Sequence, residues 1–400
     1  MKKRVLLVAA KTGYQVREFY GAAERLGVEL ALATDRCHVL DDPWADRATP
    51  VQFADPEAGI ELLKARGPFD GIVAVGDRPA YVAAEAAVRF GLRFHPPAAV
   101  AAANDKFQAR ERFRAAGLPG PSYSLDPVRE PRYPCVLKPL NFSASRGVIR
   151  ANNAREFEAA SARIREMTGG ASMLVEDFVP GREFALEGIV TAGQLQTLAL
   201  FDKPDPLDGP FFEETIYVAP SRESLDVQRK IQDAAQRAVN ALGLIHGPVH
   251  AEMRVNPQGV WMLEAAARPI GGLCARALKF ENADARGMSL EELLLRHAMG
   301  EDVSGAALAP GAHGIMMIPI PASGVFCGVE GVENARRVAD VTEVEITAKQ
   351  GQRMQALPEG SSYLGFIFAD ARSPEEAERA LRTAHGYLHF TIGRDLPVVR

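Results

Sequence analysis

Short apolar runs alternate with segments of helical periodicity over the first hundred residues. The runs lie at 4–10, 28–34 and 71–77, and the helical segments lie around 15–26 and 80–90. Buried strands that alternate with helices are typical of a parallel sheet covered by helices. The pattern therefore predicts a parallel α/β domain over residues 1–100, with its first buried strand at 5–10.

Prolines and a helix mark the end of this domain. Pro96 and Pro97 interrupt the chain. An amphipathic segment then runs from Asn104 or Asp105 to Gly117. Asn and Asp are favoured N-cap residues, and glycine often ends a helix. We expect a helix here and a domain boundary near residue 100.

Charged residues interrupt the strands that follow. Strand patterns with charges at otherwise apolar positions lie at 134–140, 172–179, 182–190, 248–255 and 260–269. A third block has strand patterns at 314–320, 341–349 and 363–370, then a helix from Pro374 to about Tyr387 with Ser373 as its N-cap. We expect an α/β and α+β protein with a core at 101–305 and a small α+β cap at 306–400.

The composition fits a folded protein and limits its partners. Of 400 residues, 47% are apolar, and 46 basic against 51 acidic residues leave a net charge of −5. This balance produces no global field that would gather nucleic acid or an anionic membrane. No stretch reaches about 18 apolar residues without a charge, and the N-terminal apolar run stops at Lys11, too early for a signal peptide. We expect small-molecule partners, no nucleic acid, no membrane and a cytoplasmic location.

Several common sites are excluded by missing motifs. The four cysteines, Cys37, Cys135, Cys274 and Cys327, form no CxxC pair, which argues against zinc and against a disulfide scaffold. The turn after the first strand, AAKTGYQV, lacks the GxGxxG of dinucleotide-binding proteins, and no GxxxxGK[ST] occurs. An NAD-dependent oxidoreductase is therefore disfavoured.

The strongest local signal is a hairpin over residues 250–269. Its turn, Asn256-Pro257-Gln258-Gly259, has proline and glycine where a turn needs them. A three-residue loop would pair Asn256 with Val260 and place Glu252 directly opposite Glu264 on one face. Like charges at such a distance, about 4.5–5.5 Å between Cβ atoms, destabilise a sheet unless a cation lies between them.

A hard cation is the natural occupant of such a pair. Mg²⁺ or Mn²⁺ takes oxygen ligands and completes its shell with waters and substrate phosphates. Arg268 continues the same face of the strand. The alternative is a solvated outer face on which Arg254 neutralises the two glutamates.

Lys138 lies in the middle of an apolar strand, with Val136 and Leu140 on its own face. Its ammonium therefore points to an anion or an open cleft. The loop that follows, NFSASRGV at 141–148, is rich in hydroxyls and glycine, so its N–H groups and Arg146 could close over phosphates. The alternative is an edge-strand lysine beside an ordinary connector.

Further charges lie in 172–190, and two histidines lie near the hairpin. Glu176 ends one strand, and Glu183 and Glu187 share a face of the next. Each reads as a rim charge on its own, and for Glu187 we keep that interpretation. His246 and His250 flank Gly247-Pro248, and we interpret them as hydrogen-bonded structural residues.

Together these residues resemble the ATP-grasp superfamily in order and approximate spacing over about residues 100–300. They are Lys106, Lys138 with its loop, Glu176 to Glu183, Glu252, Glu264 and Arg268. The flanking blocks are similar to that family's N-terminal α/β domain and C-terminal cap. The resemblance implies an ATP-grasp fold in which two lobes hold ATP, with the lid lobe at about 120–180.

The resemblance implies that one set of residues contacts ATP, with two lysines at the phosphates, a loop as a mobile lid, a hinge beside adenine and a glutamate at the ribose. Lys106 and Lys138 would contact the phosphates, and Ser143, Ser145, Arg146 and Gly147 would form the lid. Glu176, Asp177, Phe178 and Val179 would form the hinge beside adenine, and Glu183 would bind the ribose.

It also implies a reacting centre. Glu252 and Glu264 would hold one or two Mg²⁺ ions, Arg268 would face the γ-phosphate, and Gly271 and Gly272 would line the acyl site. Lys138 and Arg268 would be the catalytic residues.

The chain departs from the family at one position, because Ala266 stands where an asparagine is common. The shell of the second metal ion is therefore open, and a water or another side chain would have to fill it. Lys203 corresponds loosely to a further phosphate contact.

The activity that the resemblance implies is an ATP-dependent carboxylate–amine ligase with an acyl-phosphate intermediate. LEAAARPIGG and GIMMIPIPASG are most similar to the branch that joins amino acids, whose members are often dimers. Alternatives are a biotin-carboxylase-like enzyme, a purine-synthesis ligase, and a non-catalytic nucleotide-binding regulator, which Ala266 alone favours.

Overall fold

The computed structural model describes residues 2–10, 15–35, 48–128, 130–283 and 285–394. Its first part is a four-stranded sheet in the order β3-β2-β1-β4, in which every pairing is parallel. The strands are β1 (Arg4–Ala9), β2 (Glu29–Thr34), β3 (Thr49–Pro50) and β4 (Gly71–Val75), and the helices are α1 (Val16–Leu26), α2 (Glu57–Arg66) and α3 (Asp77–Phe90). The predicted parallel α/β layer is confirmed, whereas the turn around Lys11 and the residue Cys37 lie outside the described residues.

Two helices follow this N-terminal sheet. The expected helix is α5 (Lys106–Ala115), and Asp105 is its N-cap because its side chain accepts from the Gln108 N–H. Helix α4 (Pro97–Ala103) was not expected, because the two prolines in the sequence indicate an interruption. Pro97 instead opens the helix, where its missing N–H removes no helical hydrogen bond.

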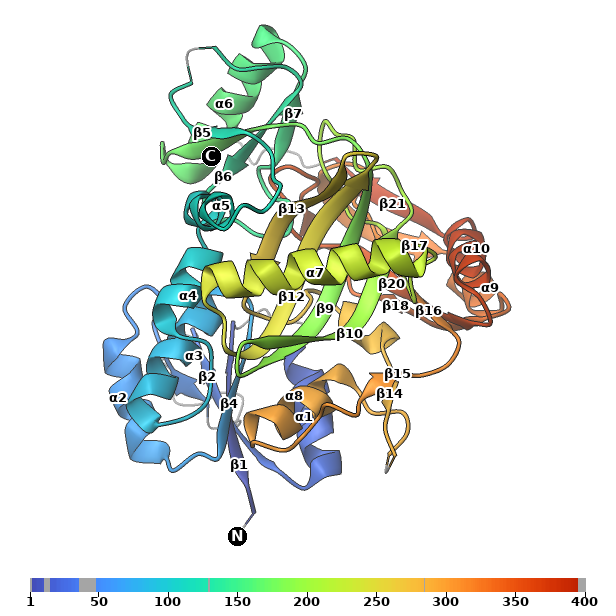
Figure 1. Ribbon diagram of the computed structural model, residues 1–400. Coiled ribbons are helices and arrows are strands. Elements are labelled where there is room, and N and C mark those ends of the chain that lie inside the picture. Colours follow the sequence, from blue (N-terminus) through green and yellow to red (C-terminus); the bar gives the residue numbers. More distant parts are fainter. Residues whose placement is uncertain (1, 11–14, 36–47, 129, 284, 395–400) are drawn as a thin grey trace, which may run out of the picture.

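A small antiparallel sheet comes next, in the order β5-β8-β6-β7. It consists of β5 (Tyr123–Leu125), β6 (Cys135–Pro139), β7 (Ile149–Ala151) and β8 (Met173–Asp177), with α6 (Ala154–Thr168) packed against it. Leu137, Ile164 and Met173 are fully buried in its own core. This unit, called the small lobe below, lies at one end of the molecule (Figure 1).

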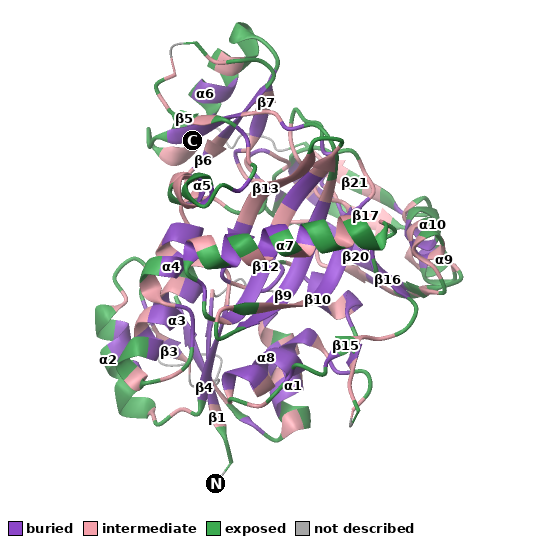
Figure 2. Ribbon diagram, viewed as in Figure 1, coloured by how far each residue is buried: buried purple, intermediate pink, exposed green. Residues whose placement is uncertain are grey.

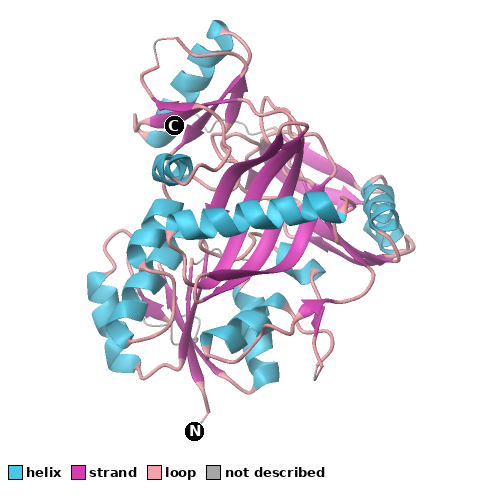
Figure 3. Cartoon of the chain, in the orientation of Figure 1, coloured by secondary structure: helices cyan, strands magenta, loops and turns pink. Residues whose placement is uncertain are grey.

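The largest sheet has eight strands in the order β13-β12-β9-β10-β11-β16-β20-β18, all antiparallel. They are β9 (Arg182–Thr191), β10 (Gln194–Lys203), β11 (Ile216–Ala219), β12 (His246–Asn256), β13 (Gly259–Ala266), β16 (Ala312–Ile318), β18 (Val341–Ile346) and β20 (Gly365–Ala371). Helix α7 (Leu225–Leu242) lies across one face of this sheet (Figure 3). The sheet continues past residue 305, so strands of the expected core and the expected cap are hydrogen-bonded neighbours.

The remaining elements are short or peripheral. They are η1 (Cys274–Ala277), β14 (Phe280–Glu281), α8 (Leu290–Ala298), β15 (Ala307–Leu308), β17 (Gly324–Glu330), α9 (Val332–Arg336), β19 (Arg353–Met354), α10 (Pro374–His385) and β21 (His389–Gly393). Ser373 is confirmed as the N-cap residue of α10, because its side chain accepts from the Glu376 N–H. Among the described residues, none of the helices combines the length and apolar character needed to cross a membrane.

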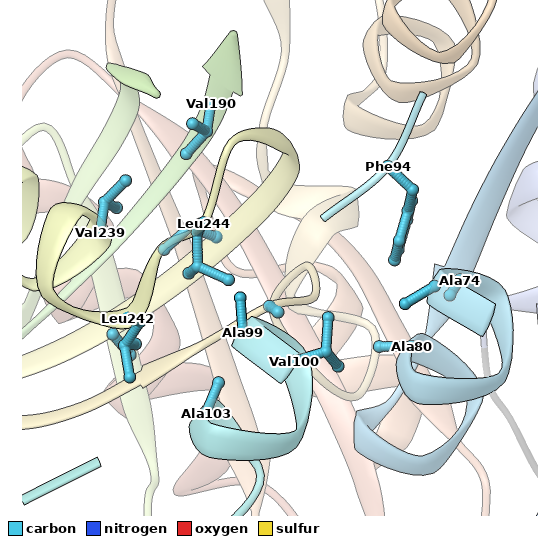
Figure 4. Close-up of a cluster of buried hydrophobic side chains, with 14 of the residues drawn as sticks. Ala74, Ala80, Phe94, Ala99, Val100, Ala103, Val190, Val239, Leu242 and Leu244 are labelled. Atoms are coloured by element: carbon cyan, nitrogen blue, oxygen red, sulfur yellow. The ribbon is translucent and has the colours of Figure 1, made fainter. Parts of the chain in front are cut away.

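The central core joins the N-terminal sheet to the large sheet. Figure 2 shows the strands of the large sheet as mostly buried, while the outer side of α7 is exposed. Alanines of α4, among them Ala99 and Ala103, lie beside Leu242 and Leu244 at the end of α7 (Figure 4). Small side chains let α4 approach closely, so α4 and α7 brace the N-terminal sheet against the large sheet.

The small lobe meets the large sheet at one crossing. Strands β8 and β9 are consecutive in the chain but belong to different sheets, and residues 178–181 connect them. Gly181 has φ +133°, and a Cβ there would lie 2.5 Å from the Val255 carbonyl oxygen, so only glycine fits. The connection is thereby held against the β12–β13 hairpin.

Candidate active site

A cavity of about 350 Å³ is lined by the N-terminal sheet, the small lobe and the large sheet together. Its wall includes most residues singled out from the sequence: Lys106, Lys138, Ser143, Ser145, Glu176, Asp177, Phe178, Val179, Glu183, Glu252, Glu264, Arg268, Gly271 and Gly272. Positions from 106 to 272 thus meet in one place, as a single ligand site requires.

Two residues expected in the lid loop do not line this cavity. The Arg146 guanidinium lies 4.6 Å from the Phe142 ring centroid and donates to the Glu359 carbonyl oxygen. The Gly147 N–H donates to the carbonyl of Pro358. The loop at 143–148 therefore rests on the C-terminal block, and only its first residues and Val148 face the cavity.

The β12–β13 hairpin places Glu252 directly opposite Glu264, as expected. The expected three-residue loop is wrong, however, because Asn256 pairs with Gly259 rather than Val260. A bulge after Glu252 adds one residue on β13 and restores the register. The two errors cancel, so both carboxylates still face the cavity.

Lysines lie beside both of these carboxylates. The Lys203 Nζ lies 2.7 Å from a Glu252 oxygen, and the Lys106 Nζ lies 3.7 Å from a Glu264 oxygen. Arg254 instead donates to Glu183 at 2.9 Å, so the alternative in which Arg254 neutralises the pair is wrong. The arrangement supplies hard oxygen donors at the wall of an open cavity, and these donors fit Mg²⁺ or Mn²⁺.

Lys203 does not line the cavity itself, but it contacts three glutamates that do. Its Nζ donates to Glu183 at 3.0 Å and to Glu214 and Glu252 at 2.7 Å each. One oxygen from each glutamate lies within 4.8 Å of the others. Burial lowers the pKa of Lys203, but the charges of Glu214 and Glu252 outweigh it, so the pKa rises and the lysine stays charged.

Glu187 is not a rim charge, which corrects the expectation from sequence. Its side chain is completely buried, accepts from His250 Nδ1 at 3.1 Å and accepts from the Ile270 N–H. The strand alternation was read correctly, but α1, β1 and the 268–278 segment cover a face that was taken as open. Glu187 therefore ties β9 to β12 and to the segment after β13.

His250 has a partner on each side, which agrees with a hydrogen-bonded structural residue. Its Nε2 lies 3.5 Å from a Glu252 oxygen. Burial lowers its pKa, but hydrogen bonds to Glu187 and Glu252 outweigh it and raise the pKa to about 9. His250 also pairs with Ala266 on the neighbouring strand. The His250 side chain therefore lies across from the position at which the family commonly has asparagine.

Lys138 reaches the buried carboxylate of Glu176 rather than open solvent. Its Nζ lies 2.6 Å from one Glu176 oxygen, and Arg110 donates to the other. Burial raises the pKa of the Glu176 carboxyl, but the charges of Arg110 and Lys138 outweigh it and lower the pKa to about 2. This triad joins α5 to both inner strands of the small lobe.

Replacing Glu176 with glutamine is expected to lower the free energy of unfolding at pH 7 by about 3–5 kcal/mol, because two buried cations would lose their counter-charge. Since the folded pKa lies below that of the unfolded chain, the stabilisation is present above about pH 4.5 and is lost as the pH falls toward 2. Urea unfolding at pH 7 and at pH 3 measures both effects. Asp226→Asn, at an exposed pair with Lys230, is the matched control and should change nothing measurable. An equal loss at both pH values would contradict the assignment.

Arg268 is fixed by Asp77, a residue that was not expected at the site from the sequence. Its Nε donates to Asp77 at 2.7 Å. Burial lowers the pKa of Arg268, but the charges of Asp77 and Glu264 outweigh it, so the pKa rises. Asp77 follows β4, and Gln15 follows β1, so both stand at the carboxyl ends of parallel strands and line the cavity. Ligand sites commonly form at that edge, which was the available signal for both residues.

An antiparallel lobe and a larger sheet that enclose two lysines, two facing carboxylates and an arginine define a two-lobed nucleotide-binding fold. Residues 131–277 match the ATP-grasp domain, and residues 316–393 match the L-amino acid ligase C-terminal domain 2. The chain belongs to the ATP-grasp family, in its amino-acid ligase branch. The expected fold is thereby confirmed.

Three relatives illustrate the similarity. Alanine–anticapsin ligase of Bacillus subtilis is 28% identical over 250 residues, which are 54% of this chain and 52% of that protein. D-alanine–D-alanine ligase of Gloeobacter violaceus is 30% identical over 219 residues, 50% of this chain and 69% of that protein. The crystal structure of L-amino acid ligase from Bacillus licheniformis superposes with a TM-score of 0.83 and 25% identity, covering 98% of this chain and 99% of that one. The chain spans about half the length of the first of these relatives.

Proposed function

We propose that this protein is an ATP-dependent carboxylate–amine ligase that joins amino acids. The observation that carries the proposal is the pair Glu252 and Glu264, which lie opposite each other at the cavity wall. Arg268, two residues after the end of β13, lines the same cavity. A carboxylate is a poor electrophile until one of its oxygens becomes part of a leaving group. Transfer of a phosphoryl group from ATP supplies that leaving group.

The reaction balances in two steps. A carboxylate oxygen of the first substrate bonds to the γ-phosphorus of ATP, the bond to the bridging oxygen breaks, and ADP leaves. The amine of the second substrate then bonds to the acyl carbon, the carbon–oxygen bond to phosphate breaks, and the amine loses a proton. The products are an amide, ADP and phosphate.

The proposed roles of the cavity residues follow their positions. Lys106 and Lys138 hold the phosphates, and Arg268, held by Asp77, faces the transferring phosphoryl group. Glu252 and Glu264 would hold Mg²⁺, which when bound neutralises charge on the triphosphate.

The ATP end of the cavity completes the proposal. Residues 176–179 lie beside adenine, Glu183 lies at the ribose, and the loop at 143–148 covers the phosphates and excludes water. Gly271 and Gly272 line the acyl site. Lys203 contributes indirectly, because its ion pairs with Glu183 and Glu252 hold these two cavity-lining carboxylates in place.

The domain boundaries, the location in the cell and the oligomeric state belong to the same proposal. We propose an N-terminal domain at 1–100, an ATP-binding core at 101–305 with its lid lobe at about 120–180, and a cap at 306–400. We also propose a cytoplasmic location, as expected from the sequence, and a homodimer, which the resemblance to the family supports.

The test measures ADP release from Mg·ATP against a matrix of carboxylic acids and amines that includes the amino acids, with mass spectrometry of every positive mixture. We expect an adduct of two amino acids with one ADP for each bond formed. ADP release only with bicarbonate would instead favour a carboxylase. ATP binding without ADP release in any mixture would favour a regulator. Omission of the amine is the control for uncoupled hydrolysis.

A further inference from the structure

The Gln15 side chain carries a buried acceptor at the cavity that no described residue satisfies. Gln15 precedes α1, is 3% exposed and lines the cavity. Its Nε2 donates to the Ile270 carbonyl oxygen, whereas its Oε1 is buried without a partner. The amide orientation is fixed, because the reverse orientation would place two acceptor oxygens against each other.

The surroundings of this oxygen belong to the reacting end of the cavity. Ile270 is bound at both backbone groups, with its N–H on Glu187 and its carbonyl on Gln15. Arg268 lies two residues before it, and Gly271 follows it at the proposed acyl site. Gln15 therefore lies beside the segment that holds Arg268 and the proposed acyl site.

An unsatisfied buried acceptor in a ligand site calls for a ligand that donates. The triphosphate offers only acceptor oxygens, so it cannot satisfy Gln15. Adenine is proposed at residues 176–179, on the side of the small lobe. Both substrates of an amino-acid ligase carry amino groups, which donate N–H bonds.

We propose that Gln15 Oε1 accepts a hydrogen bond from a substrate amino group and thereby selects amine-bearing substrates. The proposal rests on the proposed ligase function and names a residue that recognises its substrates. The amino group comes either from the amino acid that is activated or from the amino acid that attacks, and the experiment separates these two sources.

The test compares the full chain with its Gln15→Met variant, which keeps the side-chain length but has no acceptor oxygen. L-alanine, L-leucine and L-methionine are activated with hydroxylamine as the acceptor, each beside its deamino analogue: propionate, 4-methylpentanoate and 4-(methylthio)butanoate. If the activated amino acid donates, Gln15→Met lowers kcat/KM for the amino acids by about ten- to a hundred-fold and leaves the deamino acids unchanged. If the attacking amino acid donates, the hydroxylamine assay is unchanged by Gln15→Met. In a second assay, in which an amino acid replaces hydroxylamine as the acceptor, the KM of that amino acid then rises by a similar factor while the KM of ATP and of the activated acid stay constant.

Amino and deamino acids separate recognition from support of Ile270, because Gln15→Met loses the donor to the Ile270 carbonyl with either kind of acid. An equal loss with amino and deamino acids would show a purely structural role and overturn the proposal. If wild-type protein releases no ADP with any amino acid, the proposed function fails instead, which distinguishes the two failures.

Discussion

Replacing Glu264 with glutamine is expected to lower Mg²⁺-dependent turnover by about 10³-fold, because the charge that a metal ion contributes at a transferring phosphoryl group is worth several kcal/mol. Glutamine keeps the shape of the side chain but removes the negative charge opposite Glu252. The Glu264 side chain is 30% exposed and lies near Lys106, so the fold should remain intact. The measurement is ADP release at a Mg²⁺ concentration that saturates the wild-type protein.

The matched control is Glu330→Gln, which makes the same change at an exposed carboxylate of β17. This control should turn over at the wild-type rate, and both variants should keep the wild-type melting temperature within a few degrees. Unchanged turnover in Glu264→Gln would refute the metal assignment.

Replacing Arg268 with lysine is expected to lower kcat by about 10²–10³-fold while changing the KM of ATP little, because a preorganised donor acts mainly on charge that develops in the transition state. Lysine keeps one positive charge but lacks the planar fork with which the guanidinium donates to Asp77 through Nε and to the Pro269 carbonyl through Nη1. Steady-state kinetics with varied ATP separate the two parameters.

The control for this substitution is Arg276→Lys. Arg276 lies eight positions further along, forms ion pairs with Glu343 and Glu345, and does not line the cavity. Its activity should stay close to that of the wild-type protein. A large rise in the KM of ATP with kcat unchanged in Arg268→Lys would show that Arg268 binds ATP in the ground state rather than acting in the transition state.

Periodicity and turn chemistry in the sequence were enough to predict the elements that form the site. The parallel N-terminal sheet, the N-caps Asp105 and Ser373, and the β12–β13 hairpin are as expected. These features depend on residues close together in the chain, where local geometry leaves few choices. The facing glutamates were found for the same reason, although a bulge had to compensate for the wrong loop length.

The burial of charged side chains could not be predicted in this way. Glu187 and Glu183 share a strand, yet one is completely buried and the other lines the cavity. How far this shared face of β9 is covered depends on β1, α1 and the 268–278 segment, which are distant in sequence. A strand pattern shows whether two residues lie on the same face or on opposite faces, but not what packs over them.

The sequence by itself thus determined the fold class, the order of the elements and the residue types that can bind phosphate and metal. Only the tertiary structure decided which polar groups meet: Lys203 with three glutamates, Arg268 with Asp77, and Gln15 with Ile270. Each of these contacts joins separate elements, two of them across more than 190 positions of the chain. Their strength depends on burial and distance, and both quantities exist only after the sheets and lobes have packed together.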